Sequence, residues 1–176
     1  GDPARTSSFS YSDGPETSLL SYPSYQALRR DNTLVTGLLA TGIASRLDVS
    51  VDAGSIDGDR PRGRFVSGNY FEVLGVPAAL GRTFDSSADQ AIGGAPMVTI
   101  SHAYWMRRFA GDRGVVGKEV TINGARFTIT GVTPERFTGE IVGTPTDIWI
   151  PLTMRDVVYP NQRVLNVDDA HWLLLM

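Results

Sequence analysis

The chain has 176 residues, of which 41% are hydrophobic and 20% are charged, and its net charge is −3 at neutral pH. These values are typical of a globular protein that is long enough to bury a proper core. The 16 basic residues are spread along the chain, so there is no electrostatic footprint for nucleic acid. No run approaches the roughly 18 apolar residues of a membrane span, and the lack of cysteines excludes disulfides and thiolate metal sites.

The N-terminal part of the chain predicts a tether followed by a helix. Residues 1–20 are rich in Ser, Thr, Gly and Pro, which is typical of a flexible segment. A helix is expected to begin near Pro23, because proline suits a first helical position, and to end at residues 31–32. Tyr25 and Leu28 lie three residues apart, as neighbours on one face of this helix do.

Two strands are predicted next. Residues 34–43 are almost continuously apolar, which favours a strand buried on both faces. Leu47, Val49 and Val51 then alternate with polar residues, as in a strand with one solvated face. Residues 54–63 have the composition of a turn.

The stretch 64–84 is the one around which we expect the rest of the chain to be organised. It predicts a short strand over residues 64–67, and then a short helix. Phe71 and Leu74 lie three apart on this helix, so they should form a plug that presses onto the sheet. One further turn is expected at residues 81–84.

A polar loop, a strand and a second long helix follow. Residues 85–96 include two adjacent glycines and predict a loop, and residues 97–100 predict a short strand. Ser101 is a good N-cap for a helix. Trp105 and Phe109 lie four apart on one stripe of that helix.

The clearest local signal is the pair Asn123–Gly124, which is preferred in a two-residue type I′ hairpin turn. This turn places Ile122 opposite Ala125, Val120 opposite Phe127, and Lys118 opposite Ile129. The resulting register gives one apolar face made of five side chains: Val120, Ile122, Ala125, Phe127 and Ile129. Two further strands are predicted at residues 147–152, where Pro151 stops the strand, and at residues 172–176.

No residue stands out as a candidate for catalytic chemistry. His102 lies three residues before Trp105 on the same helical stripe, so it is interpreted as a half-buried packing residue, and so is His171. Residues 114–118 end in Gly-Lys but lack the remaining glycine spacing and the Ser or Thr of a phosphate loop, and we interpret them as a turn. No esterase elbow and no zinc-protease motif is present.

Four acidic residues and three aromatic residues also have structural interpretations. The spacing of the four aspartates does not match an EF-hand calcium loop, and we expect a solvated acidic face and turn: Asp48, Asp52, Asp57 and Asp59. Tyr104, Trp105 and Trp149 are expected to cover the core, although an exposed subset would suggest a carbohydrate platform. We therefore predict no catalytic, cofactor-binding or metal-binding residues, and no binding residue is assigned.

Four segments together carry a resemblance to a known family. They are SYPSYQALR (21–29), FVSGNYFEVLGVPAALGRTF (65–84), VTISHAYWMRRFAGDRGVVGKEVTINGARFTITGVTPERF (98–137) and DIWIPL (147–152). In order and spacing, these segments resemble the MacB-like periplasmic core domain of FtsX-like ABC transporter permeases, particularly the duplicated permeases of soil bacteria. The resemblance covers residues 21–176.

The resemblance implies an α+β fold with a mixed sheet and short covering helices. It implies a βαβ-type lobe and a more β-rich lobe within residues 21–176, which follow the tether of residues 1–20. The family's usual continuation after residues 171–173 is missing, so we expect the fold to be truncated at its C-terminal edge. The family has no catalytic residues and no cofactor to carry over.

Two functions are compatible with these sequence features. The resemblance implies a non-catalytic extracytoplasmic (periplasmic) part of an inner-membrane permease, soluble by itself. It would couple ATP-driven motion of membrane helices to the handling of substrate or adaptor outside the membrane. The alternative is a small-ligand or glycan-binding module. An exposed patch of Tyr, Phe and Leu would favour docking, whereas a concave pocket lined by Trp would favour ligand binding.

The same resemblance implies the partners. ATP would be hydrolysed by a separate cytoplasmic ATPase subunit that contacts the full-length permease. A periplasmic adaptor or a lipoprotein substrate, and a second copy of the permease, are the other expected partners. No nucleic-acid partner is expected.

Overall fold

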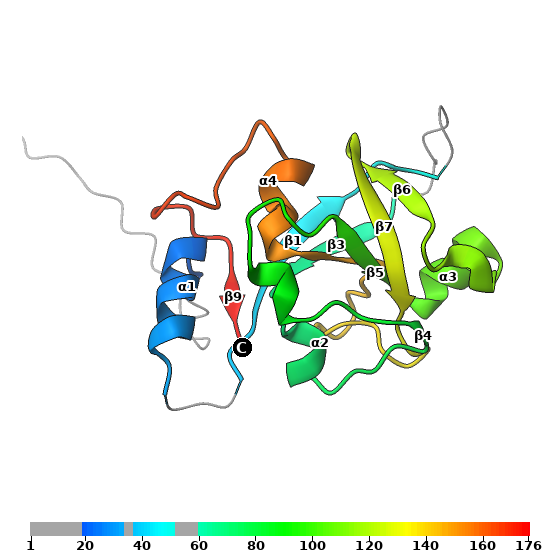
Figure 1. Ribbon diagram of the computed structural model, residues 1–176, viewed down its shortest axis with the longest axis horizontal. Helices are drawn as coiled ribbons and strands as arrows, with labels where there is room; N and C mark the ends of the chain where they lie inside the picture. Colours follow the sequence, from blue (N-terminus) through cyan, green and yellow to red (C-terminus); the bar gives the residue numbers. More distant parts are fainter. Residues whose placement is uncertain (1–18, 34–36, 52–59) are drawn as a thin grey trace, which may run out of the picture.

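The computed structural model describes residues 19–33, 37–51 and 60–176. Nine strands form one mixed sheet that curls around the core, and short helices lie around it (Figure 1). The predicted tether lies outside the described residues except for its last two positions.

The strands and helices have the following bounds. The strands are β1 (Ala40–Arg46), β2 (Val49–Ser50), β3 (Arg62–Val66), β4 (Leu80–Gly81), β5 (Met97–Ile100), β6 (Glu119–Ile122), β7 (Ala125–Val132), β8 (Ile148–Pro151) and β9 (Leu174–Leu175). The α-helices are α1 (Tyr22–Asp31), α2 (Tyr70–Val73), α3 (His102–Phe109) and α4 (Arg155–Val158). Three short 3₁₀ helices are η1 (Ser86–Asp89), η2 (Arg113–Val115) and η3 (Leu152–Met154).

The strand order is β2-β6-β7-β5-β8-β3-β1-β9, and β4 pairs with β7 beside this path. The pairs β3/β8 and β5/β7 are parallel, and the other pairs are antiparallel. This mixed sheet with short covering helices confirms the predicted α+β class. The division into two lobes stays a prediction.

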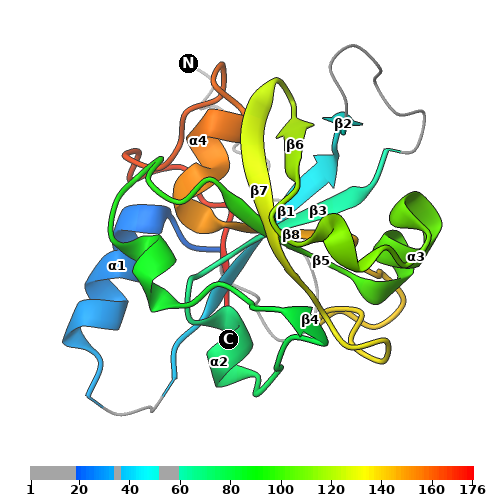
Figure 2. The same cartoon turned by 45° about the vertical axis from the view of Figure 1, so that its right-hand side comes forward.

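The sheet is curled because β1 and β2 belong to one bent segment. Only Leu47 and Asp48 separate them, yet β1 pairs with β3 and β2 pairs with β6 at the other end of the order. Figure 2 shows β1 running up into β2, beside β6. At the bend, the Asn123 N–H donates to the Asp48 carbonyl and the Asp48 N–H donates to Asn123 Oδ1, each at 2.9 Å. The hairpin tip therefore stabilises the bend between β1 and β2 that curls the sheet.

The hairpin of β6 and β7 has the predicted register. Val120 pairs with Phe127 and Ile122 pairs with Ala125. Asn123 and Gly124 have φ values of 47° and 87°, the left-handed conformation that a type I′ turn requires. Four of the five apolar side chains are buried and Ala125 is half-buried, so the predicted apolar face is confirmed.

The two long helices begin close to the predicted positions, but the cap of α1 was not predicted: α1 begins at Tyr22, so Pro23 is its second residue and not its first. Ser21 caps α1 by accepting from the Ser24 N–H, and Ser101 caps α3 by accepting from the Tyr104 N–H. Tyr25 and Leu28, three residues apart in α1, differ in burial. Tyr25 is buried, but Leu28 is 46% exposed, and Tyr22 supplies the second buried side chain. Tyr22 and Tyr25 pack together with their ring centroids 6.3 Å apart.

The two predicted N-terminal strands have different bounds from those expected. Residues 34–36 lie outside the described residues, and β1 begins only at Ala40 and runs to Arg46. Ile43 is 70% exposed, so this strand is not buried on both faces. Only residues 49–50 of the second predicted strand pair with a neighbour, because the chain bends at Leu47 to reach β6.

The stretch 64–84 contains the predicted strand and helix, but two details are wrong. Phe71 is buried, whereas Leu74 is 37% exposed, so the plug consists of Phe71 and its neighbour Tyr70. Gly81 belongs to β4, which pairs with β7 instead of forming the expected turn. This pairing needs glycine, because a Cβ on Gly131 would lie 2.3 Å from the Arg82 carbonyl oxygen.

The core under the sheet is centred on an aromatic cluster. The Phe71 ring lies 5.8 Å from Trp149 and 5.2 Å from Phe84 between centroids, in edge-on geometry. Phe137 stacks on Trp149 at 5.4 Å. Trp149, Phe71 and Phe84 are at most 2% exposed. The short helix α2 is thus held by packing, since four residues are too few to be stable alone.

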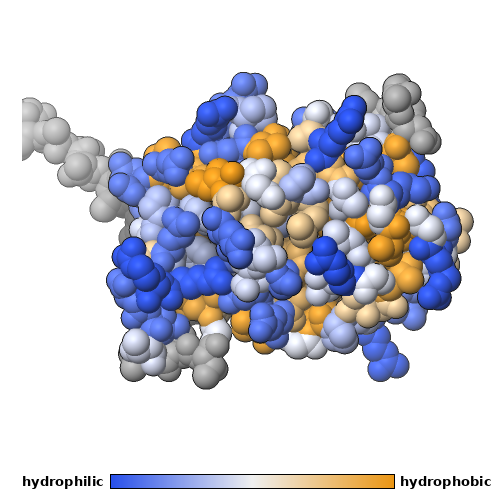
Figure 3. All heavy atoms as spheres, viewed as in Figure 1, coloured by the Kyte–Doolittle hydropathy of each residue, from blue (hydrophilic) through white to orange (hydrophobic). Residues whose placement is uncertain are grey.

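The outer surface does not gather its hydrophobic residues into one area. In the view of Figure 3, strongly hydrophilic residues gather over α1, and the most hydrophobic residues form small separate patches. The exposed aliphatic side chains with the largest exposed fractions are Val142 (99%) and Ile43 (70%). No Tyr, Phe or Trp is among the exposed large hydrophobic residues of the part that the structure describes.

The first prediction concerns the hairpin. Phe127→Ala should lower the free energy of unfolding by about 3–5 kcal/mol, because a fully buried ring is lost and a cavity remains. Chemical denaturation measures this difference. Arg126→Ala on the exposed face is the control and should change stability by less than about 0.5 kcal/mol. A loss below about 1 kcal/mol for Phe127→Ala would contradict the packing described.

Candidate functional site

The two histidines are not brought together with a catalytic partner. His102 is half-buried, and its ring packs edge-on against Trp105 with centroids 5.4 Å apart, which confirms the predicted packing role. His171 is exposed, so the same prediction is wrong for that residue. Within the described residues, no three His, Cys, Asp or Glu side chains are grouped as a metal ion would require.

The other predicted structural residues can be placed in part. Asp48 pairs with Arg60 at 2.9 Å, whereas residues 52, 57 and 59 lie outside the described residues. Residues 113–115 form η2, capped by Asp112, which agrees with a turn in place of a phosphate loop.

The aromatic residues mostly cover the core, as predicted. Trp149 and Tyr104 are at most 1% exposed. Trp105 is half-buried, and its Nε1 donates to the Asp112 carbonyl at 2.8 Å. This arrangement does not present a platform of exposed rings to a sugar.

A buried ion pair lies on one face of the sheet. Arg64 on β3 and Glu140 in the β7–β8 loop are both 4% exposed, and Arg64 Nη1 lies 2.9 Å from Glu140 Oε1. The contact is an ion pair by distance and not an aligned hydrogen bond. The Tyr70 hydroxyl donates to Glu140 Oε2 at 2.5 Å. Burial, together with the bond to Glu140 and its charge, raises the pKa of Tyr70 far above its ordinary value, so the hydroxyl stays protonated.

This ion pair fixes the long loop between β7 and β8 over the sheet. Arg64 pairs with Trp149 in the parallel β3/β8 ladder, so both side chains lie on one face. Phe137 stacks on Trp149 at the start of the loop. Three residues later, Glu140 is held by its ion pair with Arg64. The Thr146 N–H donates to the Thr138 carbonyl at 2.9 Å near its end.

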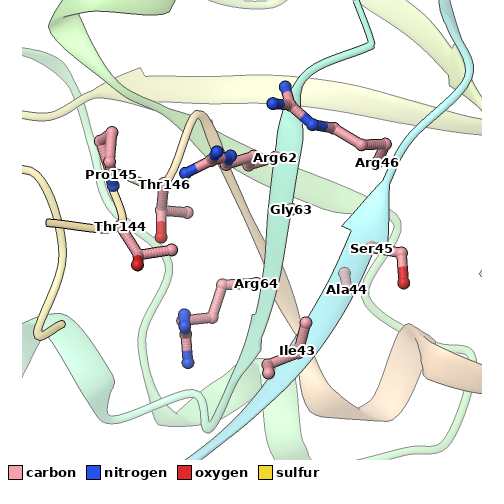
Figure 4. A pocket seen from close by; sticks show the side chains of 10 residues that line it. All are labelled: Ile43, Ala44, Ser45, Arg46, Arg62, Gly63, Arg64, Thr144, Pro145 and Thr146. Atoms are coloured by element: carbon pink, nitrogen blue, oxygen red, sulfur yellow. The ribbon is translucent and has the colours of Figure 1, made fainter.

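Beside this ion pair is a groove of about 220 Å³ between β1, β3 and the end of the loop (Figure 4). The residues that line it are Ile43, Ala44, Ser45, Arg46, Arg62, Gly63, Arg64, Thr144, Pro145 and Thr146. Figure 4 shows Arg46 and Arg62 towards one end and Ile43 at the other, with Thr144 and Thr146 on the opposite wall.

The positive charge of the groove comes from Arg46 and Arg62. Arg64 is neutralised by Glu140. Arg46 donates to the Arg60 carbonyl at 2.9 Å, and within the described part of the chain neither Arg46 nor Arg62 has a carboxylate ion-pair partner. We call this feature the arginine groove.

Neither the arginine groove nor the buried ion pair was predicted from the sequence. The spacing of Arg62 and Arg64, two apart in a strand, puts both side chains on one face and was a usable signal. The contacts of Glu140 could not be predicted from the sequence, because Glu140 lies 70 residues from Tyr70 in the chain. Arg46 faces Arg62 only because β1 contains a bulge.

The second prediction concerns the ion pair. Glu140→Ala should lower the free energy of unfolding by about 3–5 kcal/mol, because it leaves the charge of Arg64 buried without a partner. The double variant Arg64→Met with Glu140→Leu should recover most of this loss, since it removes both buried charges. Denaturant unfolding of the three proteins gives the comparison.

A matched control shows how much of the stability loss comes from the burial of the ion pair. Arg30→Ala breaks the exposed pair of Arg30 and Asp31 and should cost under about 1 kcal/mol. If Glu140→Ala costs no more than this control, Glu140 is solvated and does not fix the loop.

The sequence is similar to a known protein family and to a known transporter protein. The family model of the MacB-like periplasmic core domain matches residues 3–170. The probable export ATP-binding/permease protein MacB of Pseudomonas entomophila (strain L48) is 34% identical over 86 residues. That match covers 49% of this chain and 13% of the relative, so the chain spans a small part of that protein.

Solved structures share the fold. The periplasmic region of MacB from Actinobacillus actinomycetemcomitans superposes with a TM-score of 0.61 at 15% identity, covering 91% of this chain and 65% of that one. The extracellular domain of the noncanonic ABC-type transporter YknZ from Gram-positive bacteria gives 0.62 at 16% identity, covering 84% and 70%. In residues 19–33, 37–51 and 60–176, no helix has the length and apolar character of a membrane span.

Proposed function

This chain belongs to the MacB-like periplasmic core domain family, and from that premise we propose that it couples the motion of a permease's membrane helices to events outside the membrane. The observation that carries the proposal is the family match over residues 3–170. The family is one of periplasmic domains of transporter permeases and not of enzymes.

The architecture suits such a role. A domain that transmits displacement needs to move as a body, because a packed core passes on a shift that a loose one would absorb. The bend between β1 and β2 closes the sheet on itself, and the aromatic cluster fills it. The pair of Arg64 and Glu140 then ties the loop between β7 and β8 to this body.

The partners follow from the same proposal. ATP would be bound and hydrolysed by a separate cytoplasmic ATPase subunit, and the closure of that subunit would reach this domain through the permease helices. A periplasmic adaptor or a lipoprotein substrate would contact its outer surface, and the full-length permease would act as a dimer. The relative MacB is itself named as an export ATP-binding/permease protein, which supports an ATP-driven step.

The alternative function, a small-ligand or glycan-binding module, has less support. Its expected feature was a concave pocket lined by Trp, but the arginine groove is lined by neither Trp nor Tyr. Trp149 is buried and Trp172 packs edge-on against Phe65, at 6.1 Å between centroids. The exposed Tyr, Phe and Leu patch expected for docking is not seen on the described surface either, since its exposed large residues are aliphatic or Met.

The third prediction is that the purified chain hydrolyses neither ATP nor ester substrates, because the sequence has no phosphate loop and, among the described residues, no nucleophile is positioned beside either histidine. His102→Gln should change stability slightly and leave every activity assay at background. Phosphate release and chromogenic ester cleavage are the measurements. A turnover that is present in the parent chain and lost in His102→Gln would mean that the domain is an enzyme.

The fourth prediction tests coupling in the full-length permease. The chain has no cysteine, so single cysteines can be placed at the exposed positions Val142, Met106 and Leu28. Those that form a disulfide-linked dimer on oxidation lock two copies together. Coupling predicts that transport stops and that ATP hydrolysis changes at the same time, and that a reducing agent restores both.

Two comparisons make this experiment decisive. Oxidation of the permease that carries none of the introduced cysteines should have no effect, which controls for damage to the ATPase. Normal transport by a permease that is fully cross-linked would show that the domain is a passive platform, and the coupling proposal would be abandoned.

A further inference from the structure

We propose that the arginine groove is a docking site for an acidic peptide segment of a partner protein, which inserts an Asp or Glu carboxylate between Arg46 and Arg62. The inference goes beyond the coupling role and does not depend on it. It is carried by the charge, the shape and the hydrogen-bond state of the residues in Figure 4.

The first argument is the position of the two cations. Arg46 and Arg62 lie directly opposite one another on β1 and β3. Like charges at such positions destabilise a sheet. The pairing shifts between Ala44 and Arg46, so a bulge brings Arg46 opposite Arg62 where a regular ladder would place Ser45. An anion between the two guanidinium groups removes the repulsion that this arrangement creates.

The second argument is that the donors of the groove favour a carboxylate. Phosphate sites commonly use free backbone N–H groups. Here the Arg62 N–H already donates to Asp147 and the Thr146 N–H to Thr138, both at 2.9 Å. The guanidinium of Arg62, the remaining N–H groups of Arg46 and the hydroxyls are the other donors, and a guanidinium fork matches the planar carboxylate with two parallel bonds. The carboxylate of Asp147 beside Arg62 would also repel a dianion more than a monoanion.

The third argument is that the groove fits one side chain of a larger partner. Its volume of about 220 Å³ is below the roughly 300–1,000 Å³ of pockets that enclose a free small molecule. Apolar contacts are available next to it. Ile43 lines the far end with 70% of its surface exposed, and Val142, two residues before Thr144, is 99% exposed. An acidic residue flanked by aliphatic residues complements this surface.

The test uses the ¹⁵N-labelled 176-residue chain and two blocked tripeptides, Val-Glu-Val and Val-Gln-Val. We expect the Glu peptide to shift the side-chain Nε–H signal of Arg62 and the amide signals near Thr144, and the Gln peptide to leave them unchanged. Arg62→Met should weaken binding by about 10- to 100-fold, the loss expected for a charge-assisted fork. Arg62→Lys should weaken it less, because the charge stays and the fork is lost.

The control is Arg126→Met, which removes the same charge from the exposed face of the hairpin and should leave binding unchanged. Thr144→Val tests the opposite wall, so the proposal does not depend on one variant. Equal binding of the Gln peptide, or equal loss in Arg126→Met, would overturn it. So would stronger shifts of the same signals by inorganic phosphate or by phosphatidylglycerol vesicles, since either would assign the groove to phosphate chemistry.

Discussion

The architecture depends on one constraint, which is the shortness of the link between β1 and β2. With two residues between them, these strands pair with β3 and β6, and a flat sheet could not satisfy both pairings. The sheet must curl until its two ends meet. The bonds between Asn123 and Asp48 then hold the bend. The curl leaves an interior that only large side chains can fill, and the cluster around Trp149 fills it.

The parts of the fold that were predicted from the sequence are those with local signals. The Asn123–Gly124 turn sets a hairpin register by its own geometry, and Ser101 caps a helix through a bond that spans three residues. The errors arose where burial is decided by distant segments. Ile43 is apolar, yet it is 70% exposed, although Arg64 opposite it on β3 is buried.

The candidate site was less predictable than the fold. His102 was correctly predicted to be a packing residue, because no partner lies near it in the chain. Arg62 was given no role, since residues 54–63 were interpreted as a turn, whereas β3 begins at Arg62. Arg62 is unusual because another arginine, Arg46, lies opposite it. This pairing results from the extra residue of the bulge in β1. Such a register shift has no sequence signal that a single chain reveals.

The loop between β7 and β8 has one further consequence, which concerns how related domains diverge. It is anchored by Phe137 and Glu140 on one side and by Thr146 on the other. Between these anchors, Val142 is 99% exposed and a Cβ on Gly143 would touch nothing within 4 Å. Changes of sequence or length at this tip therefore leave the core intact, yet they move Thr144 and alter the width of the arginine groove. If the arginine groove is the docking site proposed above, changes at Val142 alter the fit of a partner without disturbing the core, whereas the φ of 80° at Gly143 favours glycine there.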